Sequence, residues 1–214
     1  MTYRLYMAPH TCALASHLAL AAAGCDFELV HVDMASGAQK SDDYRKLNPK
    51  MRVPTLIAPQ GALTETPAIL AYVAALAPDR ELMPSDPWLY AEAQAFNAYL
   101  CSTVHVAHAH RMRGTRWADD PAAIEAMMRK VPQSVTSAFE VIEERLLRGP
   151  YVMGERYGVC DMYLFTLAQW LEADGVDLAM LPRTVAHRTM MAGRPDVQAA
   201  IVAEMQLLGA ASPA

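Results

Sequence analysis

A proline stands where the residues around it predict a β-strand. Pro54 follows Val53 and precedes the apolar pair Leu56 and Ile57. Because proline cannot donate a hydrogen bond to a sheet, it belongs at the start or the edge of a strand, and a cis bond here would mark a tight turn. Such a turn leaves the backbone of Val53 available to pair with something outside the fold.

An acid–hydroxyl pair follows this step. Glu65 and Thr66 stand directly before Pro67, and proline suits the first position of a helix. The N-terminus of a helix attracts carboxylates through its unpaired N–H groups and its dipole. The two features together predict a binding site for a small, extended, charged peptide. The alternative is a turn followed by an ordinary helix start.

Composition excludes several classes of protein. A chain of 214 residues suits one or two domains, and its 53% hydrophobic content argues against disorder. The formal net charge of −5 argues against a nucleic-acid surface, and no segment is long and apolar enough to predict a membrane span. The apolar run before Cys25 lacks the basic start of a signal peptide. The cysteines are scattered, without metal-like spacing, so we expect a reducing, cytoplasmic location: Cys12, Cys25, Cys101 and Cys160.

The first part of the chain alternates strands and helices. A strand–helix–strand order predicts parallel pairing with a right-handed crossover, and Gln60-Gly61 predicts a hairpin turn. The unit therefore reads β-α-β, a polar loop over residues 35–43, and β-β-α, across residues 1–78. The expected strands are 3–8, 27–33, 55–58 and 62–64, and the expected helices are 12–23 and 67–77.

The rest of the chain has no strand pattern. Residues 79–87 are polar, contain two prolines and are typical of a linker. Residues 88–214 predict an all-helical domain, in which an almost wholly apolar segment is the buried central helix. The expected helices are 88–110, 121–148 with a kink at Pro132, 161–173 as the central helix, 182–192 and 195–208.

An ordered set of short motifs resembles the cytosolic glutathione transferase family and, within it, the bacterial beta class. The motifs are Cys12-Ala13-Leu14-Ala15-Ser16-His17, Asp42-Asp43-Tyr44, Leu47-Asn48-Pro49-Lys50-Met51-Arg52-Val53-Pro54, Leu63-Thr64-Glu65-Thr66-Pro67-Ala68-Ile69, Asp161-Met162-Tyr163-Leu164 and residues 194–199. The resemblance covers essentially the whole chain. It implies a thioredoxin-like domain over residues 1–78 followed by the all-helical domain.

The resemblance also implies the residues that bind glutathione. The backbone of Val53 would pair with the cysteinyl part of the tripeptide, next to a cis Pro54. Glu65 would meet the γ-glutamyl ammonium, and Thr66 would hold the γ-glutamyl carboxylate with its N–H and hydroxyl groups. Lys40 or Arg52 would meet the glycyl carboxylate.

Two residues match the thiol site of the beta class. Cys12 falls at the start of a helix, where a thiol pKa should drop, and the alternative is a small residue packed under that helix. His105 matches a histidine that faces the thiol. We expect Cys12 and His105, together with Tyr6, to be the catalytic residues.

The chain departs from the beta-class pattern around these residues. Ala98, rather than asparagine, precedes His105 by seven residues, and Asn97 is one position off and would point elsewhere on a regular helix. Met7 stands where beta-class proteins often carry tyrosine, while Tyr6 precedes it. Asp161 matches the capping aspartate of the central helix, but glycine at position 158 removes the hydroxyl half of that capping box.

The second domain offers candidates for an electrophile pocket. We expect it to be lined by His10, Val104, His108 and Met112. A zinc site was the alternative for the histidines, but His110 lies off the face that His105 and His108 share, and no carboxylate follows closely. We therefore expect no metal.

The sequence thus predicts an enzyme that conjugates the thiolate of glutathione to small apolar electrophiles. Two alternatives remain open: a glutathione-dependent thiol–disulfide reductase or peroxidase that uses Cys12, and a non-catalytic binding module of the same fold. Relatives of this type are usually homodimers. We expect no nucleic acid and no membrane among the partners.

Overall fold

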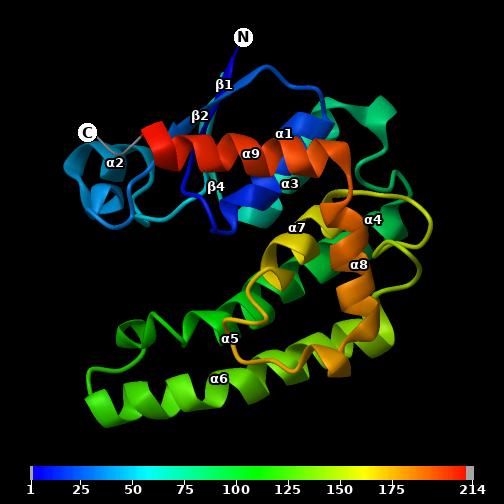
Figure 1. Cartoon of the computed structure of the whole chain (residues 1–214). Helices are drawn as coiled ribbons and strands as arrows, with labels where there is room; N and C mark the ends of the chain where they lie inside the picture. Colours follow the sequence, from blue (N-terminus) through cyan, green and yellow to red (C-terminus); the bar gives the residue numbers. More distant parts are fainter. Residues whose placement is uncertain (1, 211–214) are drawn as a thin grey trace. The chain divides into compact units, whose positions relative to one another are not determined.

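A computed structural model describes residues 2–210 of the chain. Its contacts divide the chain into two compact units, one formed by residues up to 87 together with those from 192 onward, and the other by Trp88–Met191. The predicted order, a βαβ–ββα arrangement followed by helices, is confirmed (Figure 1).

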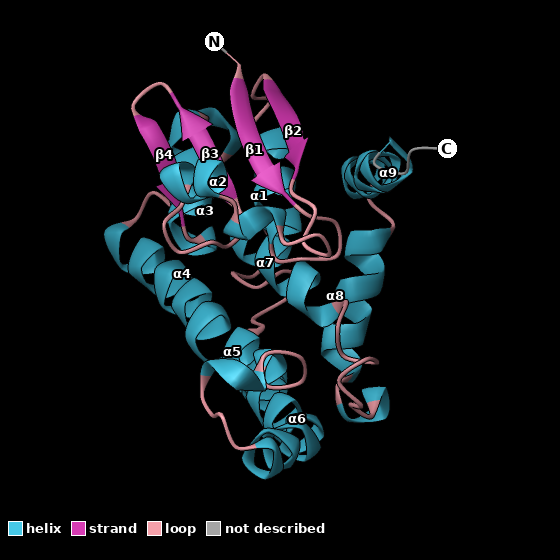
Figure 2. Ribbon diagram, turned by 90° about the vertical axis from the view of Figure 1, so that its left-hand side faces the viewer, coloured by secondary structure: helices cyan, strands magenta, loops and turns pink. Residues whose placement is uncertain are grey.

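A four-stranded mixed sheet forms the centre of the first unit (Figure 2). The strand order is β2-β1-β3-β4; β1 and β2 are parallel, and the other pairs are antiparallel. The parallel pair follows from the helix that separates its strands. The strands are β1 (Tyr3–Met7), β2 (Phe27–His31), β3 (Thr55–Ala58) and β4 (Gly61–Thr64).

Strand β1 alternates between two environments. Leu5 and Met7 are fully buried, whereas Arg4 is exposed and the half-buried Tyr6 lies against the ring of Tyr44. Apolar residues on one face of a strand predict that helices cover that face. The helices of this part of the chain are α1 (Ala13–Ala22), α2 (Asp42–Leu47) and α3 (Thr66–Leu76), of which α1 and α3 pack on each other.

The segment expected to be a polar loop contains helical turns. A 3₁₀ turn, Ala38–Lys40, leads into α2, and Ser41 caps that helix by accepting a hydrogen bond from the Tyr44 N–H at 3.2 Å. Serine with two aspartates in the first turn is a helix-start pattern that favours this outcome.

The C-terminal helix α9 (Pro195–Ala210) belongs to the first unit (Figure 1). It packs on α1, where His17 Nδ1 lies 3.3 Å from Glu204 Oε1, and both residues are buried. The contacts therefore group this segment with the first unit rather than with the expected helical domain of residues 88–214, because α9 packs on α1 and buries Val197, Ala200 and Glu204.

The second unit is helical, and two of its helices contain wide turns. At the first, the His105 N–H donates to the carbonyl of Leu100, and at the second the Leu147 N–H donates to that of Ile142. The expected helix 88–110 is thus interrupted, and the expected helix 121–148 ends in such a turn. The elements are α4 (Pro87–Tyr99), the π turn Leu100–Val104, α5 (His105–Ala109), α6 (Pro121–Val141), the π turn Ile142–Leu146, α7 (Val159–Ala168) and α8 (Pro182–Ala192).

Helix α7 is buried along its whole length, as predicted for the central helix. It starts at Val159 and ends at Ala168, earlier than the expected end at residue 173, because turns follow. Asp161 accepts hydrogen bonds from the N–H groups of Gly158 (2.8 Å) and Val152 (2.7 Å), and His187 Nε2 lies 2.9 Å away. The expected capping by Asp161 through backbone N–H groups is confirmed.

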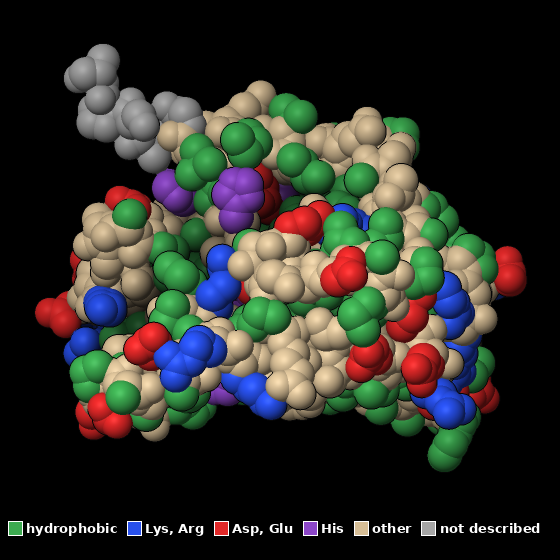
Figure 3. All heavy atoms as spheres, turned by 60° about the horizontal axis from the view of Figure 1, so that its bottom comes forward, with side chains coloured by type: hydrophobic (Ala, Val, Ile, Leu, Met, Phe, Trp, Pro, Cys, Tyr) green, Lys and Arg blue, Asp and Glu red, His purple; other side chains and the backbone are tan. Residues whose placement is uncertain are grey.

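The surface carries both signs of charge. On the face drawn in Figure 3, Lys and Arg side chains lie interspersed with Asp and Glu. Among the helices of residues 2–210, none has the length and apolar character needed to cross a membrane.

Candidate functional site

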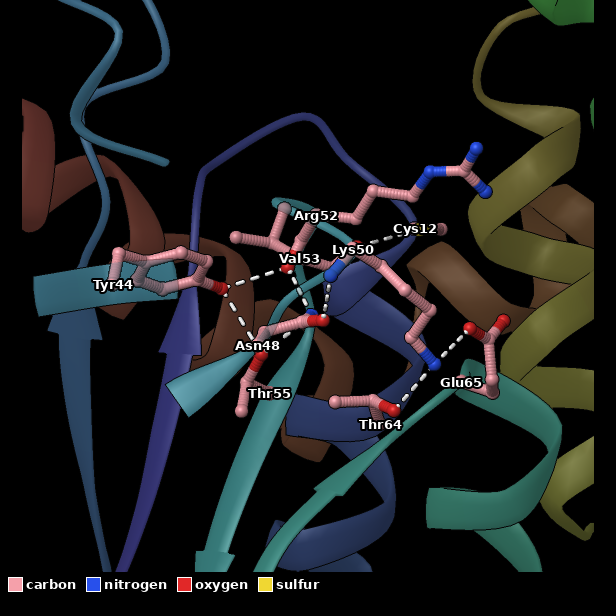
Figure 4. Close-up of polar contacts among 9 residues, drawn as sticks. All are labelled: Cys12, Tyr44, Asn48, Lys50, Arg52, Val53, Thr55, Thr64 and Glu65. Carbon is pink, nitrogen blue, oxygen red and sulfur yellow. Dashed lines mark hydrogen bonds and ion pairs between the residues drawn. The ribbon is translucent and has the colours of Figure 1, made fainter. Parts of the chain in front are cut away.

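The Val53–Pro54 bond is cis, as predicted, and a buried asparagine holds the segment around it. Asn48 is 1% exposed, and its Nδ2 donates to the carbonyl of Arg52 (2.8 Å) and to Thr55 Oγ1 (3.0 Å). Its Oδ1 accepts from the Lys50 N–H at 3.0 Å (Figure 4). One side chain therefore joins both ends of the segment that presents Val53.

Tyr44 supports the same segment from α2. Its hydroxyl donates to the Arg52 carbonyl at 2.7 Å and lies 3.0 Å from Thr55 Oγ1. Burial raises the pKa of Tyr44, which keeps the hydroxyl protonated as a donor. The rings of Tyr6 and Tyr44 pack edge to face, with their centroids 6.0 Å apart. Tyr44 and Asn48 form part of the family motifs, but their supporting roles depend on contacts that local sequence patterns do not reveal.

Cys12 lies next to Val53. It precedes α1, is 8% exposed, and its Sγ is 3.6 Å from the Val53 carbonyl oxygen. The structure thus brings together two residues that the sequence placed in one site from separate motifs. A thiol at the start of α1 also experiences the positive end of the helix dipole.

Glu65 and Thr66 begin α3, as predicted. Thr66 is buried, while Glu65 has a φ of +76° and its side chain makes no capping bond. The Glu65 carboxylate instead pairs with Lys50, whose Nζ is 2.5 Å from Oε1 and donates to Thr64 Oγ1 at 2.6 Å (Figure 4). Lys50 was not among the predicted site residues. The only sequence feature that pointed to Lys50 was its place within the Leu47–Pro54 motif.

The candidates for the glycyl end occupy exposed positions. Lys40 ends the 3₁₀ turn before α2, and the side chain of Arg52 extends away from Tyr44 in Figure 4. His10 is also exposed, in a turn after β1 with a φ of +60°. Both Lys40 and Arg52 stay predictions for the glycyl carboxylate.

In the second unit, two predicted residues surround one tryptophan. The ring of His105 lies 5.2 Å from that of Trp170, and the ring of His108 stacks on Trp170 at 4.1 Å. His108 Nδ1 lies 2.7 Å from the buried carboxylate of Asp174, which Arg111 Nε also approaches at 3.1 Å. The imidazole of His108 is therefore held by a carboxylate and an aromatic face.

The other two predicted pocket residues of this unit differ in exposure. Val104 is 2% exposed and packs in the core of the helical unit, whereas Met112 is 75% exposed. Their assignment to an electrophile pocket stays a prediction. Within residues 2–210, no three His, Cys, Asp or Glu residues are grouped as metal ligands would be.

Comparisons with known proteins agree with this geometry. The family model "Glutathione S-transferase, N-terminal domain" matches residues 1–75. Glutathione S-transferase GstA of Escherichia coli O157:H7 is 33% identical over 204 residues, which are 94% of this chain and 98% of that protein.

Solved structures are similar over the same extent. A glutathione transferase homologue from Sulfitobacter with bound glutathione is 41% identical, with a TM-score of 0.91 over 96% of this chain and 98% of that one. The bacterial beta-class glutathione S-transferase of Sphingomonas chungbukensis is 31% identical, with a TM-score of 0.81 over 94% and 98%. Since sequence and fold agree over almost the whole of each chain, this chain belongs to the glutathione S-transferase family of enzymes.

Proposed function

We propose that the protein conjugates the thiolate of glutathione to small apolar electrophiles. One observation carries the proposal: the cis Val53–Pro54 step lies beside the Cys12 thiol, and Glu65 and Thr66 begin a helix of the same unit. The 41% identical Sulfitobacter structure with bound glutathione supports glutathione as the co-substrate.

The backbone and the start of α3 divide the recognition of glutathione between them. Val53 pairs with the cysteinyl part, and the N–H and hydroxyl groups of Thr66 hold the γ-glutamyl carboxylate, which the dipole of α3 favours. Glu65 receives the γ-glutamyl ammonium. Arg52 or Lys40 meets the glycyl carboxylate.

Catalysis consists of holding the glutathione sulfur as a thiolate and positioning it for attack. The N-terminus of α1, at Cys12, favours negative charge on a nearby sulfur. Tyr6 and His105 keep their predicted catalytic roles in this proposal, and His10, Val104, His108 and Met112 keep theirs in the electrophile pocket. The electrophile accepts the sulfur lone pair, and its leaving group departs with the bonding electrons.

The test combines binding and turnover. We expect the protein to be retained on glutathione–agarose and to conjugate glutathione to chlorodinitrobenzene, followed by absorbance. Thr66→Ala removes one hydrogen bond to a charged group and should lower kcat/KM about 10-fold to 100-fold. Thr115→Ala, at an exposed position, is the matched control. A protein that neither binds the resin nor conjugates any electrophile of a broad panel would refute the proposal.

The position of the Cys12 sulfur favours a second candidate function, reduction of glutathionylated thiols. The Cys12 thiolate would attack the glutathione sulfur of a mixed disulfide and release the substrate thiol. A second glutathione thiolate would then attack the Cys12–glutathione disulfide, restoring Cys12 and leaving oxidised glutathione. Cys12→Ser should abolish this activity, with Cys25→Ser as the control.

We also propose that the protein is a cytoplasmic homodimer; the scattered cysteines favour that compartment, and the resemblance to the family implies the dimer. Light scattering coupled to gel filtration should give twice the mass of one chain. A monomer at micromolar concentration would contradict this part of the proposal.

A further inference from the structure

The carboxylate predicted to bind the amino group of glutathione already has a cation. Lys50 Nζ lies 2.5 Å from Glu65 Oε1 and 2.6 Å from Thr64 Oγ1 (Figure 4). The side chains of Lys50 and Glu65 are 43% and 57% exposed. An ammonium group of the protein therefore occupies the carboxylate that a ligand ammonium would need.

The surrounding structure holds this pair in place. The Lys50 N–H donates to Asn48 Oδ1, so that the backbone of the lysine is tied to the buried asparagine that supports Val53. Glu65 adopts a left-handed φ that non-glycine residues seldom take, and its side chain makes no capping bond. Both partners are thus directed toward each other by backbone that also forms the candidate site.

We propose that Lys50 determines specificity at the γ-glutamyl end of the site, by neutralising Glu65 whenever the bound ligand has no ammonium group. The inference rests on the proposed function. It widens the ligand class to glutathione-type peptides whose amino group is acylated or missing.

The two kinds of ligand make opposite demands on Lys50. A ligand with a free ammonium group must displace Lys50 from Glu65 or share the carboxylate with it, so Lys50 weakens its binding. A ligand without that group would leave a bare Glu65 close to its own γ-glutamyl carboxylate, and two anions at short range repel each other. Lys50 removes that repulsion, so it strengthens binding of the second kind of ligand.

The exposure of the pair sets the size of the effect. An ion pair open to solvent contributes little, and each of the two effects should amount to about twofold to fivefold in affinity. Such a weak pair opens readily, which allows glutathione itself to bind.

Calorimetric titration of the full chain tests the inference with two probes, S-methylglutathione and its N-acetyl derivative. The S-methyl group prevents exchange with Cys12. Relative to wild type, Lys50→Gln should bind S-methylglutathione about twofold to fivefold more tightly and the N-acetyl derivative more weakly by a similar factor. Lys46→Gln, which removes an exposed lysine of α2 paired with Asp43, should leave both affinities unchanged.

Each other result overturns the inference in a different way. Weaker binding of both probes by Lys50→Gln would show that Lys50 contacts a ligand carboxylate directly. Unchanged affinities would show that the pair does not influence the site, and urea unfolding of the variant excludes a folding defect. If wild type binds neither probe and is not retained on glutathione–agarose, the proposed function fails as well. If wild type is retained but Lys50→Gln does not change the two affinities in opposite directions, the inference alone is rejected.

Discussion

Replacing Asn48 with alanine should damage both the fold and the candidate site. The side chain is 1% exposed and makes three hydrogen bonds, to the Arg52 carbonyl, to Thr55 Oγ1 and from the Lys50 N–H. Alanine removes all three and leaves a small cavity beneath the cis Val53–Pro54 step.

The expected cost follows from what the partners can recover. The Arg52 carbonyl and Thr55 Oγ1 keep the hydroxyl of Tyr44, and water can reach the exposed Lys50. The three lost hydrogen bonds cost about 1 kcal/mol each, and the replacement partners recover part of that cost. The cavity adds a further cost, so we expect a loss of about 2–4 kcal/mol in the free energy of unfolding. Tyr44→Phe keeps the ring and should cost about 1–2 kcal/mol.

Urea denaturation measures the loss, and hydrogen exchange of the peptide covering residues 49–58 locates it. We expect faster exchange in that peptide and weaker binding of S-methylglutathione. Gln206→Ala, at an exposed position of α9, should stay within about 0.5 kcal/mol of wild type. A loss below about 1 kcal/mol for Asn48→Ala, with unchanged exchange, would refute the role assigned to this residue.

Two further predictions concern titratable groups of the helical unit. Burial raises the pKa of the Cys160 thiol far above its ordinary value, so iodoacetamide should label it only in the unfolded protein; mass spectrometry showing labelling of the native state would contradict this. The hydrogen bond from Arg188 holds the pKa of Glu172 below its ordinary value of 4.5. A lowered carboxyl pKa stabilises the folded state above pH 4.5, and that stability is lost as the pH falls through the folded value. Arg188 also donates to the Ala168 carbonyl at 2.9 Å, a contact that does not depend on pH. Urea midpoints of wild type and Arg188→Gln should therefore differ by a constant amount above pH 4.5 and by a smaller amount in acid, and a gap that widens in acid would contradict the assignment.

The predictions that succeeded were those that depend on local rules. A proline at a strand start and an acid–hydroxyl pair before Pro67 follow from backbone chemistry, and both are found as expected. The contact between Lys50 and Glu65 was missed because Glu65 lies beyond the β3–β4 hairpin, and no local pattern specifies that approach. The placement of α9 with the first unit was missed for the same reason, since helical periodicity does not reveal which surface a helix packs against.

The wide turn at Leu100–Val104 changes how positions along this helix must be counted. In a regular α-helix, residues seven apart stand within about 20° of one axial line, and residues eight apart diverge by about 80°. In the wide turn, the His105 N–H donates to the carbonyl of Leu100, five residues back instead of the usual four. Such a turn takes up about one extra residue. Asn97, eight residues before His105, is thereby brought into phase with it, although a regular helix would have turned it aside. Asn97 thus lies on the same side of the helix as His105, although it stands one residue earlier in the sequence than the asparagine of the beta-class pattern.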